Sequence, residues 1–306
     1  MEIQVSSQGF EYGVKHFYSP NDGIAIDIIK NALNLDHSVV FSLFEIGAIY
    51  INNQRCLDPN QNINFGTQLR VHTKPRRYYV NYDWKSRIVF DHDDFVILNK
   101  PSGLPSHPSV DNIIENSLTQ LERALNTKLH ISHRLDTTTE GLIVYGKKTE
   151  FVKAFNMQLQ SKNIEKKYVA LIQSSERLPV RLIHYMEQSP RAPKKVSQIF
   201  NETWDECELV IEEQKKYDLD GLSDIHLIRI NLLTGRTHQI RAQLSEIGNP
   251  LLGDIMYGSK IPWRANNHST AQVALKSCSI DFTYKTQRHH FELPEEFDLL
   301  EQDGIS

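Results

Sequence analysis

Apolar residues near the start of the chain recur at the spacing of an amphipathic helix. The positions that follow the i, i+3, i+4, i+7 pattern are Ala25, Ile28, Ile29, Ala32 and Leu35. A second short helix is predicted from about Asp36 or Ser38 to Gly47, a residue suited to the left-handed position after a helix. Residues 49–51 and 69–71 predict strands, and Asn52-Asn53 predicts a tight turn. These elements indicate a small domain that ends, with a basic linker, near residue 80.

The remainder of the chain reads as a sheet with few helices. Helical spacing occurs at residues 116–125 and 151–159, whereas strand patterns occur at 95–98, 142–145, 168–172 and 228–232. We therefore expect an α+β domain over residues 81–306, with a large, mainly antiparallel mixed sheet flanked by helices and loops.

Composition agrees with two globular domains, because 306 residues with 40% hydrophobic content can bury about two cores. The formal net charge of −4 argues against a generally basic nucleic-acid binder. Positive charge is nevertheless clustered, at residues 70–77, at 191–195 and in the six lysines of residues 147–167. Such clusters are either solvated faces or contacts for an anionic partner, and both interpretations remain open here.

The cysteines and the N-terminus bear on the compartment. Cys56, Cys207 and Cys278 are far apart and odd in number, so neither a disulfide framework nor a Cys-x-x-Cys site is expected. The first residues lack the pattern of a signal peptide, and no apolar run approaches the roughly 20 residues that span a bilayer. We expect a cytoplasmic protein without membrane contact.

Several chemistries find no support in the sequence. The run Gly141-x-x-x-x-Gly146-Lys147-Lys148 resembles a phosphate-binding loop, but it lacks the final hydroxyl and contains an apolar strand. No histidine or cysteine spacing offers a metal-ligand set, and no Gly-x-Ser-x-Gly elbow occurs. The remaining candidate groups are a carboxylate, several arginines and an aromatic residue.

The carboxylate lies in the stretch Ser132–Gly141. Arg134 and Asp136 are two residues apart, so in an extended segment they point to the same side while Leu135 points into the core. Taken alone, such a pair is usually an exposed ion pair. A second stretch, residues 233–241, crowds two arginines, a histidine and a glutamine behind a strand, which favours an anionic ligand.

Together these stretches resemble the RluA-type pseudouridine synthases over residues 90 to about 295. The motifs that carry the resemblance are Asn99-Lys100-Pro101-x-Gly103-Leu104, His133-Arg134-Leu135-Asp136-x-x-Thr139-x-Gly141, Lys166-x-Tyr168, Thr234-Gly235-Arg236-Thr237-His238-Gln239-Ile240-Arg241 and Gly248-x-Pro250-x-x-Gly253-Asp254-x-x-Tyr257-Gly258. The N-terminal module resembles an S4-like RNA-binding domain; a small structural or docking domain is the alternative for it.

The resemblance implies an RNA-modifying isomerase that needs no cofactor or metal. It implies Asp136 as nucleophile or as base at the ribose, Arg241 as the partner that favours the charged carboxylate, and Tyr168 as the ring that stacks on a flipped uracil. The residues it implies as RNA contacts are Arg134, which enters the space left by the base, and His133, Lys166, Arg236, His238, Gln239 and Lys100. Ribosomal or transfer RNA would be the partner, and a monomer is the simplest expectation.

Some positions depart from the family pattern. Glu140 replaces a small residue four positions after Asp136, and we expect it to face solvent. Gln272 and Lys276 replace an arginine and a histidine, and the second predicted helix lies in a stretch without Lys or Arg between Lys30 and Arg55. A non-catalytic RNA-binding or assembly protein on the same fold therefore remains as an alternative.

Overall fold

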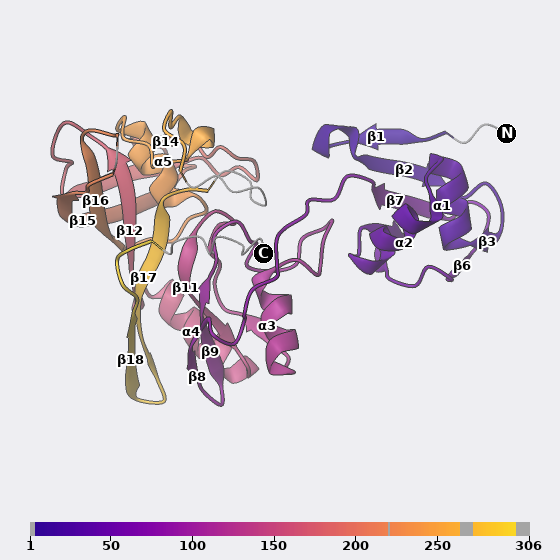
Figure 1. The fold of residues 1–306 in the computed structure, drawn as a ribbon, viewed down its shortest axis with the longest axis horizontal. Helices are drawn as coiled ribbons and strands as arrows, with labels where there is room; N and C mark the ends of the chain where they lie inside the picture. The colour runs from indigo at the N-terminus through magenta and orange to yellow at the C-terminus, as the bar shows by residue number, and fades with distance from the viewer. Residues whose placement is uncertain (1–3, 220, 264–271, 298–306) are drawn as a thin grey trace. The chain divides into compact units, whose positions relative to one another are not determined.

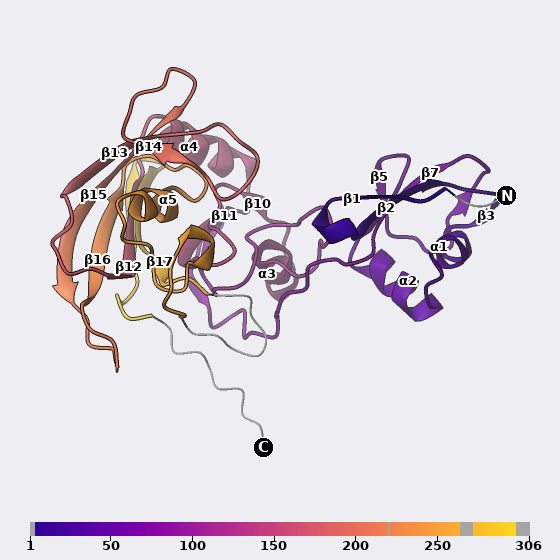
Figure 2. The same cartoon turned by 90° about the horizontal axis from the view of Figure 1, so that it is seen from above.

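The computed structural model describes residues 4–219, 221–263 and 272–297 (Figures 1 and 2). These residues divide into two compact units. Unit 1 contains the chain up to Val80 together with His107–Gln120, and unit 2 contains Asn81–Ser106 together with the described residues from Leu121 onward. The segment 107–120 thus belongs by its contacts to the N-terminal unit.

Unit 1 is a five-stranded antiparallel sheet with two helices, α1 (Ala25–Leu33) and α2 (His37–Glu45). Its sheet has the order β1 (Ser6–Gln8), β2 (Val14–Tyr18), β7 (Gln68–His72), β4 (Ile49–Ile51) and β5 (Gln54–Cys56), and a separate pair is formed by β3 (Gly23–Ile24) and β6 (Asn62–Ile63). A short 3-10 turn, η1 (Phe10–Tyr12), precedes β2. The two helices and one face of the sheet share one apolar core.

The predicted elements of unit 1 are confirmed. Both helices and both strands occur where the apolar spacing placed them. Gly47 has the expected positive φ of 73° after α2, and the turn residues Asn52 and Asn53 have φ values of 48° and 63°. Short-range patterning was sufficient here because each element buries its own apolar stripe.

Unit 2 is organised around an eleven-stranded mixed sheet. Its main order is β14 (Val196–Ser197), β13 (Arg181–Met186), β15 (Asp205–Lys216), β16 (Ile225–Leu232), β12 (Glu165–Gln173), β17 (Leu275–Tyr284), β11 (Glu140–Gly146), β9 (Phe95–Lys100) and β8 (Ile88–Asp91), with β10 (His130–Ile131) on β11 and β18 (Gln287–Glu292) on β17. The β11–β17 pair is parallel and the other described pairs are antiparallel. The expected α+β class with a mainly antiparallel sheet is confirmed.

The described helices of unit 2 are α4 (Thr149–Gln160) and α5 (Gln239–Glu246), with a 3-10 turn, η2 (Ile255–Tyr257). A further helix, α3 (Ser117–Leu125), begins in the segment 107–120 of unit 1 and ends in unit 2. Phe151 and Phe155 of α4 pack on an aromatic core that includes Phe95 and Phe282. Packing against these strands fixes α4 beside β11. None of the described helices is long and apolar enough to cross a membrane.

Gly141 holds β11 close to β17 directly after the Asp136 segment. Its φ is +103°, and a Cβ atom at this position would lie 2.2 Å from the carbonyl oxygen of Ser277 and 2.8 Å from its nitrogen. Only glycine allows both this backbone conformation and this approach of two strands. The segment from Ser132 to Thr139 therefore enters the sheet at a fixed point beside β17.

Candidate active site

Asp136 and Arg241 are brought together from segments about a hundred residues apart. The Arg241 Nη1 atom lies 3.5 Å from Asp136 Oδ2. The arginine side chain is only 5% exposed, whereas that of Asp136 is 22% exposed. A carboxylate that is reachable from solvent therefore rests against a buried cation, as the predicted pairing requires.

Arg241 is itself fixed from its other side. Its Nε and Nη2 atoms donate to the two carboxylate oxygens of Asp254 at 2.7 and 2.8 Å, and its guanidinium lies 5.0 Å from the ring centre of Tyr257. Burial opposes the charged form, but the hydrogen bond and charge of Asp254 outweigh it and raise the pKa of Arg241. The cation beside Asp136 is thus permanently charged and held in one orientation.

His238 occupies the position before α5, with a left-handed φ of 59°. Its Nε2 atom lies 3.8 Å from Asp136 Oδ2, and its Nδ1 atom lies 3.1 Å from the hydroxyl of Tyr257. Burial lowers the pKa of His238, and the charge of Asp136 only partly offsets this. The imidazole is therefore neutral near pH 7, so Arg241 is the main positive charge near Asp136.

Tyr168 lies on β12, next to Ser277 of β17, and is 7% exposed. Burial, followed by the nearby charge of Asp136, raises the pKa of Tyr168 far above its ordinary value, although a hydrogen bond with Ser277 opposes the shift. The side chain is therefore a neutral phenol that lies in the electric field of Asp136. The structure thus brings Tyr168 near Asp136, and the stacking role of its ring stays a prediction.

Lys100 binds backbone groups of two segments, one of which follows Asp136 directly. Its side chain is fully buried, and its Nζ atom donates to the carbonyl oxygens of Pro101, Leu104 and Thr137 at 2.9, 2.8 and 3.4 Å. Burial lowers the pKa of Lys100 to about 7, partly offset by Asp136 and Glu140. The predicted RNA contact by Lys100 is not what the structure shows, because its ammonium group points into backbone carbonyls.

Glu140 does not face solvent, so that expectation is wrong. It opens β11, is 6% exposed, and pairs in register with Lys276 of β17. Its charge acts on the ammonium of Lys100. The carboxylate that replaces a small residue is therefore buried, and Lys100 provides positive charge near it.

Two further predicted RNA contacts have internal roles. The Nε2 atom of His133 accepts a hydrogen bond from the backbone N–H of Val144 at 3.0 Å, its ring stacks on Phe155, and burial lowers its pKa to about 3. Gln239 is buried, and its Oε1 atom accepts from Thr234 Oγ1 and from the backbone N–H of Arg236. Both side chains bind groups of their own motifs or of β11; Gln239 is buried and His133 is half-buried.

The surroundings of Arg134 and Lys166 are compatible with the predicted RNA contacts. Arg134 is exposed. Lys166 packs over Gly235, where an added Cβ atom would come within 2.9 Å of its Nζ atom. Burial lowers the pKa of Lys166, and its side chain makes no hydrogen bond or ion pair with the described part of the chain. An ammonium group in this situation is suited to bind an anion.

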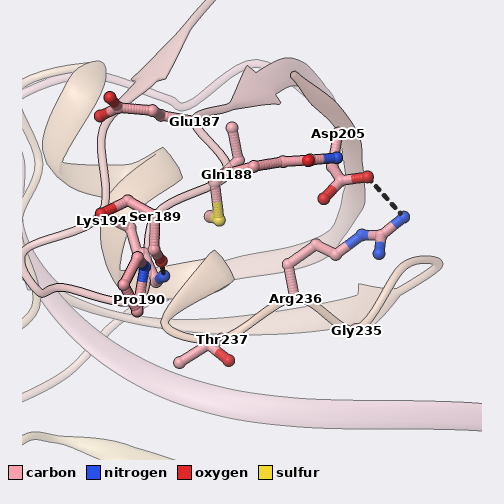
Figure 3. A pocket seen from close by; sticks show the side chains of 10 residues that line it. Glu187, Gln188, Ser189, Pro190, Lys194, Asp205, Gly235, Arg236 and Thr237 are labelled. Carbon is pink, nitrogen blue, oxygen red and sulfur yellow. Dashed lines mark hydrogen bonds and ion pairs between the residues drawn. The ribbon is translucent and has the colours of Figure 1, made fainter. Parts of the chain in front are cut away.

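Arg236 lines a cavity of about 460 Å³ (Figure 3). Its Nη2 atom lies 3.4 Å from Asp205 Oδ1, and Figure 3 shows the guanidinium directed toward this carboxylate. Residues 186–190, Lys194, Asp205 and residues 235–237 form the wall. The backbone N–H of Lys194 donates to the Tyr257 hydroxyl at 2.7 Å, so this wall is connected to His238 and the Asp136 site.

Much of the clustered positive charge is neutralised within the protein. Arg76 pairs with Asp111 and Arg77 with Glu115, each at 2.7 Å, within unit 1. In unit 2 the ion pairs of the lysine cluster are Lys147 with Asp91, Lys148 with Asp94, and Lys167 with Glu165 and Glu212. These members of the clusters are therefore paired within the protein, an outcome that neither of the two interpretations named.

Sequence reasoning assigned no role to Asp254 or Tyr257, which hold Arg241 and His238 in place. A signal for them was present, because both belong to the motif Gly253-Asp254-x-x-Tyr257-Gly258. A buried carboxylate within a motif needs a buried cation, and Arg241 was the natural candidate. Within the described residues, no group of three or more His, Cys, Asp and Glu side chains is arranged to hold a metal ion.

Comparisons with known proteins agree with this geometry. The family described as RNA pseudouridylate synthase matches residues 94–246. The "RNA pseudouridine synthase 6, chloroplastic" of Oryza sativa subsp. japonica is 30% identical over 80% of this chain and 64% of its own length. The protein of the same name from Arabidopsis thaliana is 38% identical over 66% of this chain and 47% of its own length. The chain therefore spans about half to two thirds of these two relatives.

Two further comparisons concern a relative that matches over nearly its full length and a solved structure with a similar fold. The "Ribosomal large subunit pseudouridine synthase C" of Buchnera aphidicola subsp. Baizongia pistaciae is 28% identical over 95% of this chain and 96% of its own length. The solved structure of "Human RNA Pseudouridylate Synthase Domain Containing 1" covers 68% of this chain and 82% of its own, at 20% identity and a TM-score of 0.53. The second likeness shows a shared fold.

Proposed function

Because the chain belongs to the RNA pseudouridylate synthase family, we propose that it isomerises specific uridines to pseudouridine in structured RNA. The substrate class we propose is ribosomal or transfer RNA, and a relative that matches nearly the full chain is named for the large ribosomal subunit. The reaction breaks the N-glycosidic bond between ribose and N1 of uracil and joins the ribose to C5, while C5 loses a proton and N1 gains one. No oxidant or cofactor is needed for this balance.

The observation that carries the proposal is the arrangement of Asp136, Arg241 and Asp254. Asp136 is the accessible member, Arg241 lies 3.5 Å from it, and Asp254 binds Arg241 through both carboxylate oxygens. A guanidinium held in this way binds one oxygen of the Asp136 carboxylate and leaves part of that carboxylate open to a ribose. Asp136 then acts as nucleophile or as base at the ribose.

Tyr168 supplies a ring face beside this carboxylate. Its raised pKa keeps the phenol protonated, which suits contact with the uncharged uracil ring better than proton acceptance in the resting enzyme. The uridine must leave its stack to reach this buried site, at a cost of a few kcal/mol. We propose that Arg134, which is exposed, enters the vacated space and that Lys166 binds a phosphate.

Unit 1 adds a second module for which we propose an S4-like RNA-binding role. Its order of two helices, a short strand, an asparagine turn and a final strand supports this assignment. A cytoplasmic location and a monomeric state remain predictions, and two of the relatives are named as chloroplastic proteins.

Tritium release tests the proposal. RNA transcribed with 5-tritiated uridine should lose tritium to water in the presence of the wild-type protein, and Asp136→Asn should abolish this release while keeping the fold. Asp91→Asn is the matched control, because it removes the same charge from an exposed ion pair with Lys147. Binding of RNA without any tritium release by the wild type would support the non-catalytic alternative.

A further inference from the structure

The face of the unit 1 sheet that points away from α1 and α2 carries a row of polar side chains. In the strand register, His16 lies opposite Arg70, Arg70 opposite Tyr50, and Tyr50 opposite Arg55. Residues directly opposite one another share a face of the sheet. We call these four residues the cationic row, after the two arginines among them. The apolar residues between them, such as Ile49 and Leu69, point to the helices.

Tyr50 is the centre of the cationic row. Its ring lies between two guanidinium groups, with Arg70 Cζ at 3.8 Å and Arg55 Cζ at 4.9 Å from the ring centre. The Tyr50 hydroxyl donates to the carbonyl of Val110, and Arg55 Nη2 donates to that of Ser109. Tyr50 and Arg55 are therefore fixed by the segment 107–120, which belongs to the same unit.

Arg70 differs from Arg55 because, among the described residues, no carboxylate or carbonyl oxygen binds its guanidinium. Its side chain makes no hydrogen bond or ion pair with the described residues, and its buried Nε atom has no acceptor. The contact with the face of Tyr50 fixes the plane of the guanidinium. Its buried Nε–H is out of reach of a ligand, so the two Nη groups are the donors that a ligand can meet. A fixed planar cation with free donors matches the geometry of a phosphate group.

Tyr18 adds an exposed aromatic ring to the same face. It lies two residues after His16 on β2 and is 64% exposed. Its register partner Gln68 lies two residues before Arg70 on β7, so Tyr18 and Arg70 are diagonal neighbours. An exposed ring beside a cation on a sheet face can stack one base while the cation binds the adjoining phosphate.

Charge favours this face over the helices. α2 has no lysine or arginine, its first residue being His37, and the one lysine of α1 is Lys30 in its last turn. On the sheet side, Asp111 is the carboxylate whose charge acts on Arg55, and both of its oxygens already accept hydrogen bonds from Arg76. An anionic strand would therefore meet uncompensated positive charge at the cationic row and not at α2.

We propose that unit 1 binds a single-stranded segment of the substrate RNA on this sheet face, with Arg70 on a phosphate and Tyr18 under a base. This proposal rests on the proposed function, since the RNA is the substrate of that reaction. It differs in assigning the contact to the sheet and not to the helices of the module.

The test uses the full-length chain and a fluorescent twelve-nucleotide uridine RNA. We expect Arg70→Gln and Tyr18→Ala each to weaken binding about tenfold, and Arg70→Gln to lower the salt slope by about 0.7. Tyr18→Phe should bind like the wild type, because the ring remains. Lys30→Gln is the matched control, which removes the same charge from α1 of the same unit, and it should stay within twofold.

Thermal unfolding monitored by circular dichroism verifies that each variant is folded, and in the same preparations KM for tritium release should rise while kcat stays unchanged. Binding within twofold of the wild type for both Arg70→Gln and Tyr18→Ala would overturn the proposal, as would a larger loss with Lys30→Gln. The binding measurement decides the role of the sheet face even if no tritium is released, so a failure of the catalytic proposal is recognised separately.

Discussion

Asp254 binds Arg241 and not Asp136. Its substitution tests whether Arg241 needs this second carboxylate to stay in position beside Asp136. Asp254→Asn keeps the shape of the side chain but removes its charge. Arg241 would then lose one of its two hydrogen bonds to this side chain, which measure 2.7 and 2.8 Å. Asp136 would be the charged partner that remains beside the buried guanidinium. Breaking a buried ion pair from one side costs about 3–5 kcal/mol. Because Asp136 and an amide oxygen remain as partners, we expect a loss of about 3 kcal/mol.

In a unit of this size, about 3 kcal/mol corresponds to a fall in Tm of about 6–12 °C. At a temperature where the variant is fully folded, a guanidinium displaced by about 1 Å should reduce kcat/KM for tritium release by about 10²-fold. Differential scanning calorimetry and the tritium assay measure the two effects.

Asp281→Asn is the matched control, because its partner Arg288 is 71% exposed. We expect this control to cost no more than about 1 kcal/mol and to leave tritium release unchanged. If Asp254→Asn lowers Tm no further than Asp281→Asn does, the buried pair does not contribute as reasoned. If it lowers Tm but leaves kcat/KM intact, Arg241 needs no support from Asp254.

Two other predictions concern stability. Gly141→Ala should lower the Tm by several degrees, because the Cβ atom would overlap the backbone of Ser277 at a φ of +103°; a Tm equal to that of the wild type would show that β11 and β17 can separate at little cost. The pKa of His133 is lowered to about 3 by burial, so the unfolded chain binds a proton between about pH 6.5 and pH 3 that the folded chain does not. Stability is therefore lost as pH falls through this window, and in urea titrations His133→Phe, which keeps the stacking on Phe155, should show a smaller loss; an unchanged pH profile would contradict the assignment.

The sequence by itself determined the local elements of this protein. The helix over residues 25–33 and the strand over 142–145 were predictable because their apolar spacing is a property of neighbouring residues. The motifs also placed Asp136, Tyr168 and Arg241 at one site, and the structure brings these three residues together.

The sequence did not determine which charged side chains remain available to a ligand. His133, Gln239 and Lys100 lie in the same motifs as Asp136 and Arg241, yet their polar atoms are used by backbone groups and internal partners. A motif indicates which type of residue is needed at a position. It does not distinguish a contact with a ligand from a contact that supports the backbone.

Only the tertiary structure decided the environment of Glu140 and of the positive clusters. Glu140 is enclosed because parallel pairing sets it beside Lys276, which lies more than a hundred residues away in the chain. Arg76 is neutralised by Asp111 from the segment 107–120, whereas Arg70 forms no ion pair with any described residue. Burial and charge pairing depend on which distant segments meet, and a local pattern carries no information about that meeting.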